Sequence, residues 1–359
     1  MRPPARALLI SVVPVLLLGG AMPARGELPL PLKTAAAGPH AAKPAATTFT
    51  FVGGGDIALT GSPDPRVLAG IRPYLRAADL AIGNLEGTLT TGGAPKCSGG
   101  TGCFTFRGVP AWARTLRSAG FTVLNVANNH ALDFGPEGQH DTLAALERAG
   151  LLEQGLPGQV LFVSIRGIRV ALIGCAPYAW AQSLLDVDGT ARLVRNAARR
   201  ANVVIVYMHA GAEGTDATHV GNVDETYLGE PRGNSRAFAH AMIRAGADLV
   251  FGSGPHVVRG VEWYRGRLIA YSLGNLAGTH TLSTEGSLGM SALLRVTFDS
   301  RGRIDAASVV PLRLSGFGTP AFDPARAAVP WIRTLSHQDF GAHAPGISPA
   351  GRLAVPAQM

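Results

Sequence analysis

The sequence predicts an α/β protein whose strands form a mixed sheet, or two sheets packed face to face. Short apolar runs alternate with helix-like segments early in the chain, and pairs of apolar runs joined by short turns follow later. Polar side chains stand at the ends of several of these runs. Alternation is typical of parallel β–α–β units, whereas hairpins indicate antiparallel strands, so both kinds of pairing are expected.

Each predicted element depends on a local signal. Apolar runs bounded by Gly, Pro or polar clusters predict strands, and segments with helix start and stop residues predict helices. The segment 136–149, for example, begins with Pro136 and is followed by Gly150. Expected strands lie at 49–52, 80–83, 123–126, 203–208 and 249–252, and expected strand pairs at 159–164/169–174, 261–264/268–272 and 292–298/304–312. Expected helices lie at 65–77, 110–119, 136–149, 188–200 and 234–245.

The first 24 residues have the pattern of a secretory signal peptide. Arg2 and Arg6 precede an apolar run of 12 residues, Ala7–Leu18, and small residues follow it. A membrane span needs about 20 apolar residues, so this run is short for one. We therefore expect an exported protein, extracellular, at the cell surface or periplasmic. An uncleaved N-terminal anchor is the alternative, and it would be the one contact with a membrane.

Composition divides the rest of the chain into three parts. Residues 25–48 are rich in Pro, Ala, Gly and Thr and are expected to form a disordered linker. Residues 49–314 carry the strand and helix signals and fit one large domain or two small ones. Residues 315–359 form a Pro- and Gly-rich C-terminal extension, whose aromatic residues can pack on the domain surface.

Charge and cysteine content bear on partners and compartment. The net charge of +8 suits an anionic substrate. Lys and Arg form no basic tract, so nucleic acid binding is not expected. Cys97 and Cys103 flank a Gly-rich loop, which in an exported chain predicts a disulfide between them. Cys175 ends an apolar run and is expected to be a buried free thiol.

Six apolar runs end in residues that can bind metal or do acid–base chemistry. Ligands sit at the carboxyl ends of strands in open α/β sheets, so these side chains are expected to converge. Imidazole, carboxylate and amide oxygen without thiolate suit Mn, Fe or Zn, as one or two ions. The alternative for any single residue is a helix cap or a turn. The six groups are Asp56; Asn84 and Glu86; Asn128, Asn129 and His130; His209; His256; and Ser272 and Asn275.

The ordered set of motifs around these residues resembles one known family. GGDIAL, GNLEG, ANNHALDFG, VIVYMHAGAE, GSGPHVVRG and YSLGN are similar to the motifs of the CapA family of poly-gamma-glutamate capsule synthesis proteins, over about Phe51 to Asn275. That family belongs to the calcineurin-like metallophosphoesterase superfamily. The resemblance implies a four-layer αββα metallophosphatase-like sandwich of two mixed β-sheets. It also implies a metal centre at the carboxyl ends of the strands.

The resemblance assigns roles residue by residue. Asp56, Asn129, His209 and His256 correspond to metal ligands, and Glu86 is the candidate bridging carboxylate. His130 corresponds to the catalytic histidine that donates a proton to the leaving group or stabilises developing charge. Asp133 either orients His130 or caps the following helix, and Glu213 is either a ligand or a solvated loop residue. The residues expected to contact substrate are Asn84, Asn128, Ser272 and Asn275, the last two alternatively forming a turn.

Three departures from the superfamily pattern weaken the expected metal site. Asn84 stands where the pattern has Asp, and Asp56 is not followed two residues later by His. Where the pattern often has His-x-His, this chain has Gly254-Pro255-His256, with Gly254 at the first His. Three functions remain open: a metal-dependent hydrolase of an anionic polymer or phosphoester, a non-hydrolytic or transferase role in making, exporting or anchoring poly-gamma-glutamate, and binding on a degenerate scaffold. Expected partners are that anionic substrate and the membrane proteins of capsule synthesis.

We expect the mature, exported protein to begin after Gly20, because small residues follow the apolar run there. N-terminal sequencing of the secreted product measures this directly. An intact Met1 on a soluble cytoplasmic product would contradict export.

Overall fold

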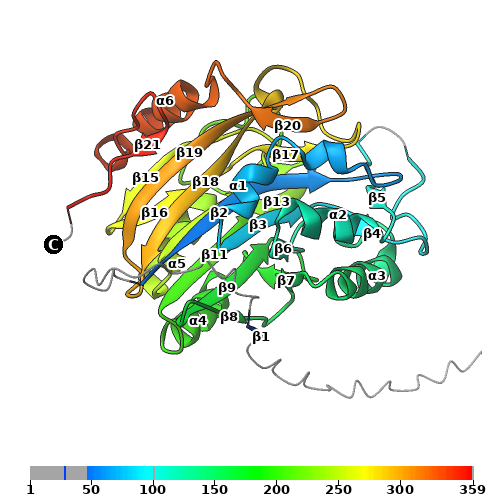
Figure 1. The fold of residues 1–359 in the computed structure, drawn as a ribbon, viewed down its shortest axis with the longest axis horizontal. Coiled ribbons are helices and arrows are strands. Elements are labelled where there is room, and N and C mark those ends of the chain that lie inside the picture. Colours follow the sequence, from blue (N-terminus) through cyan, green and yellow to red (C-terminus); the bar gives the residue numbers. More distant parts are fainter. Residues whose placement is uncertain (1–27, 30–46, 100–101, 358–359) are drawn as a thin grey trace, which may run out of the picture.

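Two mixed sheets lie face to face, with helices on their outer faces (Figure 1). The computed structural model describes residues 28–29, 47–99 and 102–357. The predicted signal peptide, residues 1–24, and most of the predicted linker lie outside these ranges. Leu28–Pro29 (β1) pairs with the second sheet, so this part of the linker is a strand and not the disordered chain expected. Among the described residues, the helices are all too short or too polar to cross a bilayer.

The first sheet has the order β20-β19-β18-β2-β3-β6-β7, with β17 beside β2 and β21 beside β19. Its centre is parallel from β2 to β7, and β18 and β19 join antiparallel. The strands are β2 (Thr48–Ala58), β3 (Leu80–Leu85), β6 (Val123–Asn125), β7 (Leu152–Gln154), β17 (Asn275–Gly278), β18 (Met290–Asp299), β19 (Ile304–Ser315), β20 (Thr319–Phe322) and β21 (Arg352–Leu353).

The second sheet has the order β1-β8-β9-β11-β14-β16-β15, with β10 beside β9. Strands β9, β11, β14 and β16 are parallel, and β8 and β15 pair antiparallel at either side. The strands are β8 (Leu161–Ile165), β9 (Ile168–Ala176), β10 (Gln182–Ser183), β11 (Val203–His209), β14 (Leu249–Ser253), β15 (Val261–Tyr264) and β16 (Arg267–Ala270). Two short pairs lie outside both sheets: β4 (Thr88–Leu89) with β5 (Arg107–Gly108), and β12 (Glu225–Tyr227) with β13 (Glu230–Gly233).

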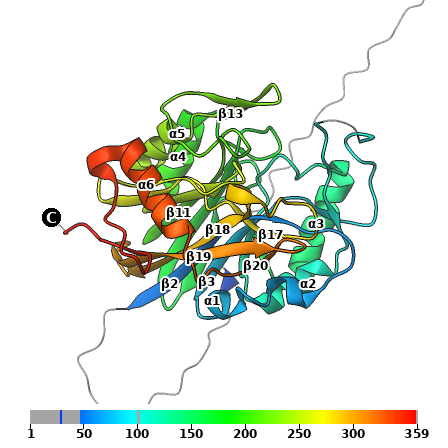
Figure 2. The ribbon, with the colours of Figure 1, turned by 90° about the horizontal axis from the view of Figure 1, so that it is seen from above.

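Three apolar clusters define four layers. The central cluster lies between the sheets and joins side chains such as Phe51 of β2 with Phe251 of β14. A second cluster covers the outer face of the first sheet with α1 (Arg72–Arg76), α2 (Trp112–Ala119) and α3 (Gly135–Arg148). A third covers the outer face of the second sheet with α4 (Val187–Ala198) and α5 (Ser235–Ala245) (Figure 2). The expected αββα sandwich of two mixed sheets is therefore confirmed.

Most predicted elements are present, with boundaries shifted by a few residues. The helix expected at 65–77 is wrong, because a 3₁₀ turn at Pro65–Leu68 and the short α1 replace it. Gly70 lies between them, where an added Cβ would be 2.4 Å from the carbonyl oxygen of Pro320. The strand expected at 49–52 continues to Ala58, with a register shift against β3 between Gly53 and Asp56. Asp56 therefore lies inside a strand and not after it.

The C-terminal extension contributes to the first sheet and to its edge. β20 and β21 both pair with β19, and α6 (Ala328–Phe340) packs Ala328, Val329 and Ile332 into the cluster between the sheets. In Figure 2, α6 lies along one end of the sandwich, where it covers the open side between the sheets. The expectation that part of this segment packs on the domain is therefore confirmed.

Gly55 permits a close approach between β2 and the segment that leads into β17. A Cβ at this position would lie 1.8 Å from the carbonyl oxygen of Gly274, and the next residue, Asp56, donates its backbone N–H to that same oxygen at 3.1 Å. A side chain at 55 would push the two backbones apart. Since Asp56 is on the same strand, this contact also sets the position of its carboxylate.

Replacing Gly55 by alanine should therefore lower the free energy of unfolding by about 3 kcal/mol, the upper range for overpacking a close backbone contact. Urea denaturation measures the change. Gly346→Ala is the control, because Gly346 is exposed and an added Cβ there would lie 3.5 Å from the Cβ of Ala354. Equal stability of the two variants would show that the contact at Gly55 is not a constraint.

Candidate metal centre and catalytic pair

Strands of both sheets deliver acidic and imidazole side chains to one buried point. Asp56 comes from β2, Glu86 from the residue after β3, and His209 from the last residue of β11. One ligand atom from each of these three residues lies within 4.8 Å of the others, and all three side chains are fully buried. His256, three residues after β14, lies beside them. Its Nδ1 is 3.3 Å from Oδ2 of Asp56, and its Nε2 is 3.8 Å from Oε1 of Glu86.

The Asp56 carboxylate receives donors from both sheets. Asn84 of β3 donates from Nδ2 to Oδ1 at 2.8 Å. From β14, the Ser253 hydroxyl also donates to Oδ1, and the backbone N–H of Gly254 donates to Oδ2 at 3.2 Å. A buried charge is tolerated only where it is hydrogen-bonded or paired, and these contacts meet that need. Asp56 is thus held in one orientation by groups far apart in the sequence.

The two neighbouring histidines lower the pKa of the Asp56 carboxyl group. Burial opposes ionisation of this carboxyl, but hydrogen bonds from His209 and His256 and their positive charge outweigh burial and hold the pKa of Asp56 well below its usual value. For His256, burial favours the neutral ring, yet the negative charge of Glu86 and the hydrogen bonds to Asp56 and Glu213 raise its pKa well above the usual value.

Glu86 provides the test of whether a cation fits here. Burial, and then the negative charge of Asp56, raise the pKa of Glu86 well above its usual value. Both carboxylate oxygens are buried, and neither has a hydrogen-bond partner among the described residues. An unsatisfied buried carboxylate is costly, and a divalent cation would remove that cost. Asp56, Glu86, His209 and His256 offer the oxygen and nitrogen donors that such an ion prefers, so the group fits a divalent metal whose binding would release protons.

Asn129 lies next to His209, as expected for residues of one metal shell. Its Oδ1 is 2.9 Å from Nε2 of His209. Its Nδ2 donates to Oε1 of Glu213 at 3.4 Å, and the other oxygen of Glu213 is 3.5 Å from Nε2 of His256. Of the two alternatives for Glu213, the structure favours a role in the site, because this carboxylate links Asn129 to His256.

His256 is held in an unusual backbone conformation. Its φ is +61°, in the left-handed region, which follows Gly254 and Pro255 at the end of β14. The Nδ1 atom contacts the side-chain oxygen of Asn275 at 2.8 Å, and this contact fixes the ring. Strained residues of this kind gather at functional sites, where the surrounding structure holds them.

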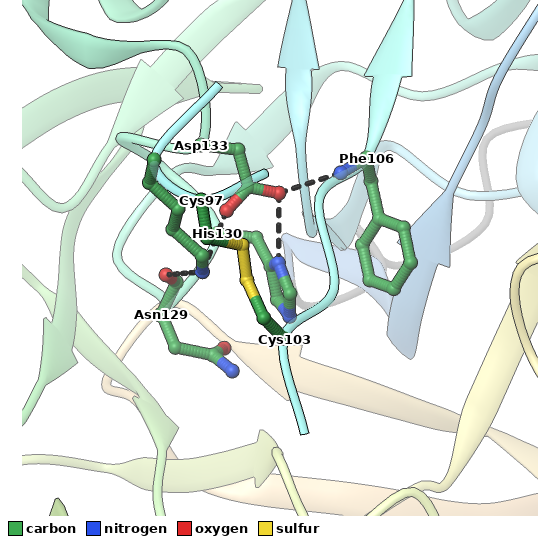
Figure 3. The surroundings of a disulfide bond; sticks show 7 residues. Cys97, Cys103, Phe106, Asn129, His130 and Asp133 are labelled. Carbon is green, nitrogen blue, oxygen red and sulfur yellow. Dashed lines mark hydrogen bonds and ion pairs between the residues drawn. A yellow bond between two sulfur atoms is a disulfide. The ribbon is translucent and has the colours of Figure 1, made fainter. Parts of the chain in front are cut away.

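His130 and Asp133 form a buried pair next to Asn129 (Figure 3). Nδ1 of His130 lies 2.8 Å from Oδ2 of Asp133, and the same oxygen accepts the backbone N–H of Phe106 at 2.6 Å. The N-cap of α3 is Phe134, and Asp133 makes no capping contact. The geometry therefore favours the first of the two alternatives, in which Asp133 orients His130. Burial lowers the pKa of His130, and the hydrogen bond to Asp133 opposes this shift.

The four residues expected to contact substrate are committed to protein partners. Asn84 donates to Asp56 and accepts from Asn125 and Asn128. Asn128 donates to the carbonyl of Leu85 at 2.9 Å and accepts the backbone N–H of His130 at 3.0 Å.

Beyond β16, the Ser272 hydroxyl donates to the carbonyl of Val257 at 2.7 Å and accepts the N–H of Gly274 at 3.2 Å, which is the alternative turn. Asn275 holds His256 and donates to the carbonyl of Leu288 at 3.1 Å. All four side chains thus form hydrogen bonds within the chain, and their contact with substrate stays a prediction.

Two residues of the site, Ser253 and Arg232, were not among those predicted from the sequence. Ser253 links Asp56 to the hydroxyl of Tyr207, and Arg232 of β13 forms an ion pair with Glu213. Arg232 is 2% exposed although it comes from a hairpin with no apolar periodicity. For Ser253, its place at the end of an apolar strand could have given a signal; for Arg232 there was none.

The fold and this group define a class: an αββα sandwich protein with a divalent-metal-type centre at its strand ends. A sequence model described as bacterial capsule synthesis protein PGA_cap matches residues 50–279. The chain belongs to this family of bacterial capsule synthesis proteins, as the motifs indicated.

Three relatives illustrate the family. The chain is 28% identical over 222 residues to the PGA biosynthesis protein CapA of Bacillus subtilis, covering 57% of this chain and 54% of that protein. It is 28% identical over 225 residues to the capsule biosynthesis protein CapA of Bacillus anthracis, covering 57% and 52%. A probable polyglutamine synthesis accessory protein of Mycobacterium tuberculosis is 30% identical over 279 residues, covering 67% of each chain. The chain thus spans about half the length of the Bacillus relatives.

Two solved structures have a partial likeness to this chain. A 5'-nucleotidase precursor from Thermus thermophilus has a TM-score of 0.43 at 17% identity, covering 74% of this chain and 54% of that one. A purple acid phosphatase from yellow lupin has a TM-score of 0.39 at 10% identity, covering 75% and 52%.

Replacing His209 or His256 by alanine should weaken metal binding by about tenfold or more, because each change removes an imidazole donor. Metal content after dialysis against limiting Mn²⁺ measures the loss. His140→Ala is the matched control, since the side chain of His140 on α3 is 83% exposed. If both site variants kept full metal content while circular dichroism showed an intact fold, the centre as described would be wrong.

Proposed function

We propose that this protein acts in the synthesis or anchoring of poly-gamma-glutamate or a related anionic cell-surface polymer, through a hydrolase-type site that binds one or two divalent metal ions. The observation that carries this proposal is the buried Asp56–Glu86–His209 group, with its unsatisfied carboxylate, beside the His130–Asp133 pair. Membership of the capsule synthesis family supports poly-gamma-glutamate or a related polymer as the substrate. The two relatives named for PGA and capsule biosynthesis support the same proposal.

In this proposal, one set of residues binds the metal ion and another moves a proton. Asp56, Glu86, His209 and His256 would hold the ion, with Asn129 at the same shell. When bound, a divalent cation supplies a Lewis acid for an anionic oxygen and makes coordinated water a better nucleophile. His130, with Nδ1 turned to Asp133, has Nε2 left to accept a proton and return it to a leaving oxygen.

Export and an anionic partner complete the proposal. The N-terminal pattern of basic residues, apolar run and small residues supports export, and a disulfide suits an oxidising compartment. The net charge of +8 favours encounter with a polyanion. We propose that the partners are this polymer and the membrane proteins that make it.

A second candidate is a phosphoesterase with a smaller anionic substrate. The His130–Asp133 pair favours it, because a histidine placed to move a proton is of use only where a bond is broken. A third candidate, binding without turnover, is favoured by Asn84, which offers Asp56 an amide donor where the superfamily pattern has a second carboxylate.

His130→Ala should lower turnover of an aryl phosphodiester by about a hundredfold while metal content stays unchanged, since the residue moves a proton and is not expected to bind the ion. Release of nitrophenol by Mn²⁺-loaded protein measures the rate, and His140→Ala is again the control. The chain length of added poly-gamma-glutamate is followed on gels in parallel.

Each outcome separates the candidates. Shortening of the polymer that requires His130 supports the first function, and turnover of the phosphodiester alone supports the second. Bound metal without turnover of either substrate leaves a non-hydrolytic role in polymer assembly. Protein that binds no metal at all would overturn the hydrolase-type site and favour a binding scaffold.

A further inference from the structure

The two chain segments that flank the Cys97–Cys103 disulfide both contact Asp133. The segment that ends at Cys97 is called the first arm, and the segment that begins at Cys103 is called the second arm. The structure joins Cys97 and Cys103 as predicted, with their Cα atoms 6.6 Å apart, and leaves Cys175 as a buried free thiol. Lys96 directly precedes the first cysteine, and Phe106 follows the second by three residues. Lys96 contacts Oδ1 of the Asp133 carboxylate. Phe106 contacts Oδ2, as Figure 3 shows.

The first arm makes three contacts with the turn that carries the catalytic pair. The ammonium of Lys96 forms an ion pair with Oδ1 of Asp133 at 2.7 Å and donates to the carbonyl of Asn129 at 3.3 Å. Its backbone N–H donates to the carbonyl of Asp133 at 2.7 Å. The Asp133 side chain is fully buried, whereas that of Lys96 is 36% exposed. Removing the cation would leave a buried oxygen without its charged partner, which is strongly unfavourable.

The second arm contacts both members of the pair. The backbone N–H of Phe106 donates to Oδ2 of Asp133, the oxygen that also binds His130. The ring of Phe106 lies 4.3 Å from the imidazole of His130, centroid to centroid. On its other side, the carbonyl of Phe106 accepts the N–H of Thr88 at 3.0 Å, at the short β4–β5 pair. This arm therefore packs the ring as well as holding the carboxylate.

The disulfide is the cross-link between the two arms. The described residues between β4 and β5 form no helix or strand, so no ladder of backbone hydrogen bonds joins the arms near their tips. Segments of this kind open locally at low free-energy cost. A covalent bond between the two arms restricts such opening, since it removes conformations in which they separate.

We propose that Lys96 is a positioning residue for His130, and that the Cys97–Cys103 disulfide keeps Lys96 and Phe106 together on Asp133. The disulfide then helps to position His130 and Asp133, in addition to stabilising the loop. Its consequence for turnover rests on the proposed hydrolytic function, but the geometry of the His130–Asp133 hydrogen bond does not. Two kinds of measurement therefore test the inference.

The first measurement is NMR of protein labelled with ¹⁵N-histidine. The Nδ1–H signal of His130, identified by its absence from His130→Gln, reports the hydrogen bond to Asp133. We expect this signal to shift or to exchange away in Lys96→Ala and in the double Cys97→Ser/Cys103→Ser variant, and to stay in place in Lys96→Arg. Arg166→Ala is the matched control, because Arg166 is an exposed cation paired with Asp79 at 2.8 Å. An unchanged signal in Lys96→Ala and in the double variant would overturn the inference.

The second measurement is turnover of the phosphodiester. We expect kcat to fall about tenfold in Lys96→Ala and in the double serine variant, the usual effect of losing an outer partner. KM and metal content should stay within about twofold, and Lys96→Arg should recover most of kcat. A fall of kcat that only follows loss of metal would show a structural role and overturn positioning.

Reduction of the wild-type protein covers the case in which the serine variant does not fold. A water-soluble phosphine breaks the disulfide: the two sulfurs gain two electrons and two protons as thiols, and the phosphine takes the oxygen of one water as its oxide. Reduced wild type should show the change in the His130 signal and the fall in kcat that are expected for the serine variant. Where the serine variant folds, the phosphine should leave it unchanged. If the wild type has no turnover at all, the proposed function fails, and the His130 signal alone decides the inference. An unchanged His130 signal after reduction would overturn the role of the disulfide.

Discussion

The hydrogen bonds around the Asp56 carboxylate are the constraint on which the site depends. Asn84 comes from the same sheet as Asp56, whereas Ser253 and Gly254 come from the other sheet, so a single buried carboxylate ties the two sheets together at their strand ends. A buried charge loses far more free energy from a missing donor than an exposed one does. These hydrogen bonds therefore fix the position of one sheet relative to the other at the point where His209 and His256 approach Asp56.

The amide at position 84 changes the electrostatics of this centre. A carboxylate there would face Asp56 directly and repel it, whereas Asn84 donates a hydrogen bond to it. The second carboxylate of the group is Glu86 instead, two residues further along, and its oxygens have no hydrogen-bond partner among the described residues. The protein thus keeps two buried carboxyl groups at the centre, but places them so that one is satisfied by the protein and the other is left for a cation.

Much of the site could be inferred from the sequence, because each of its main residues lies at or near the end of a different apolar run. Asp56, Glu86, His209 and His256 meet for that reason, since strands of packed sheets bring their carboxyl ends together. The supporting residues could not be inferred in the same way. Lys96 lies in a stretch without periodicity, and its partner Asp133 is 37 positions away in the chain. A contact of this kind depends on how a loop returns to the fold, which no local pattern records.

The sequence by itself determined the longer strands, most of the longer helices, the disulfide and the family, because burial repeats at short, regular spacing and cysteines pair where a short loop allows it. It did not indicate the short strands β7, β17 and β20, which belong to the first sheet. The tertiary structure decided what each polar residue does. Asp133 had two possible roles, and only the positions of Phe106 and His130 around its carboxylate favour the one in which it orients the histidine. The break in the helix expected at 65–77 has the same origin, since β20 approaches Gly70 from more than 200 residues away. Such contacts exist only once the sheets have packed, and their free energy then overrides the local preference of the chain.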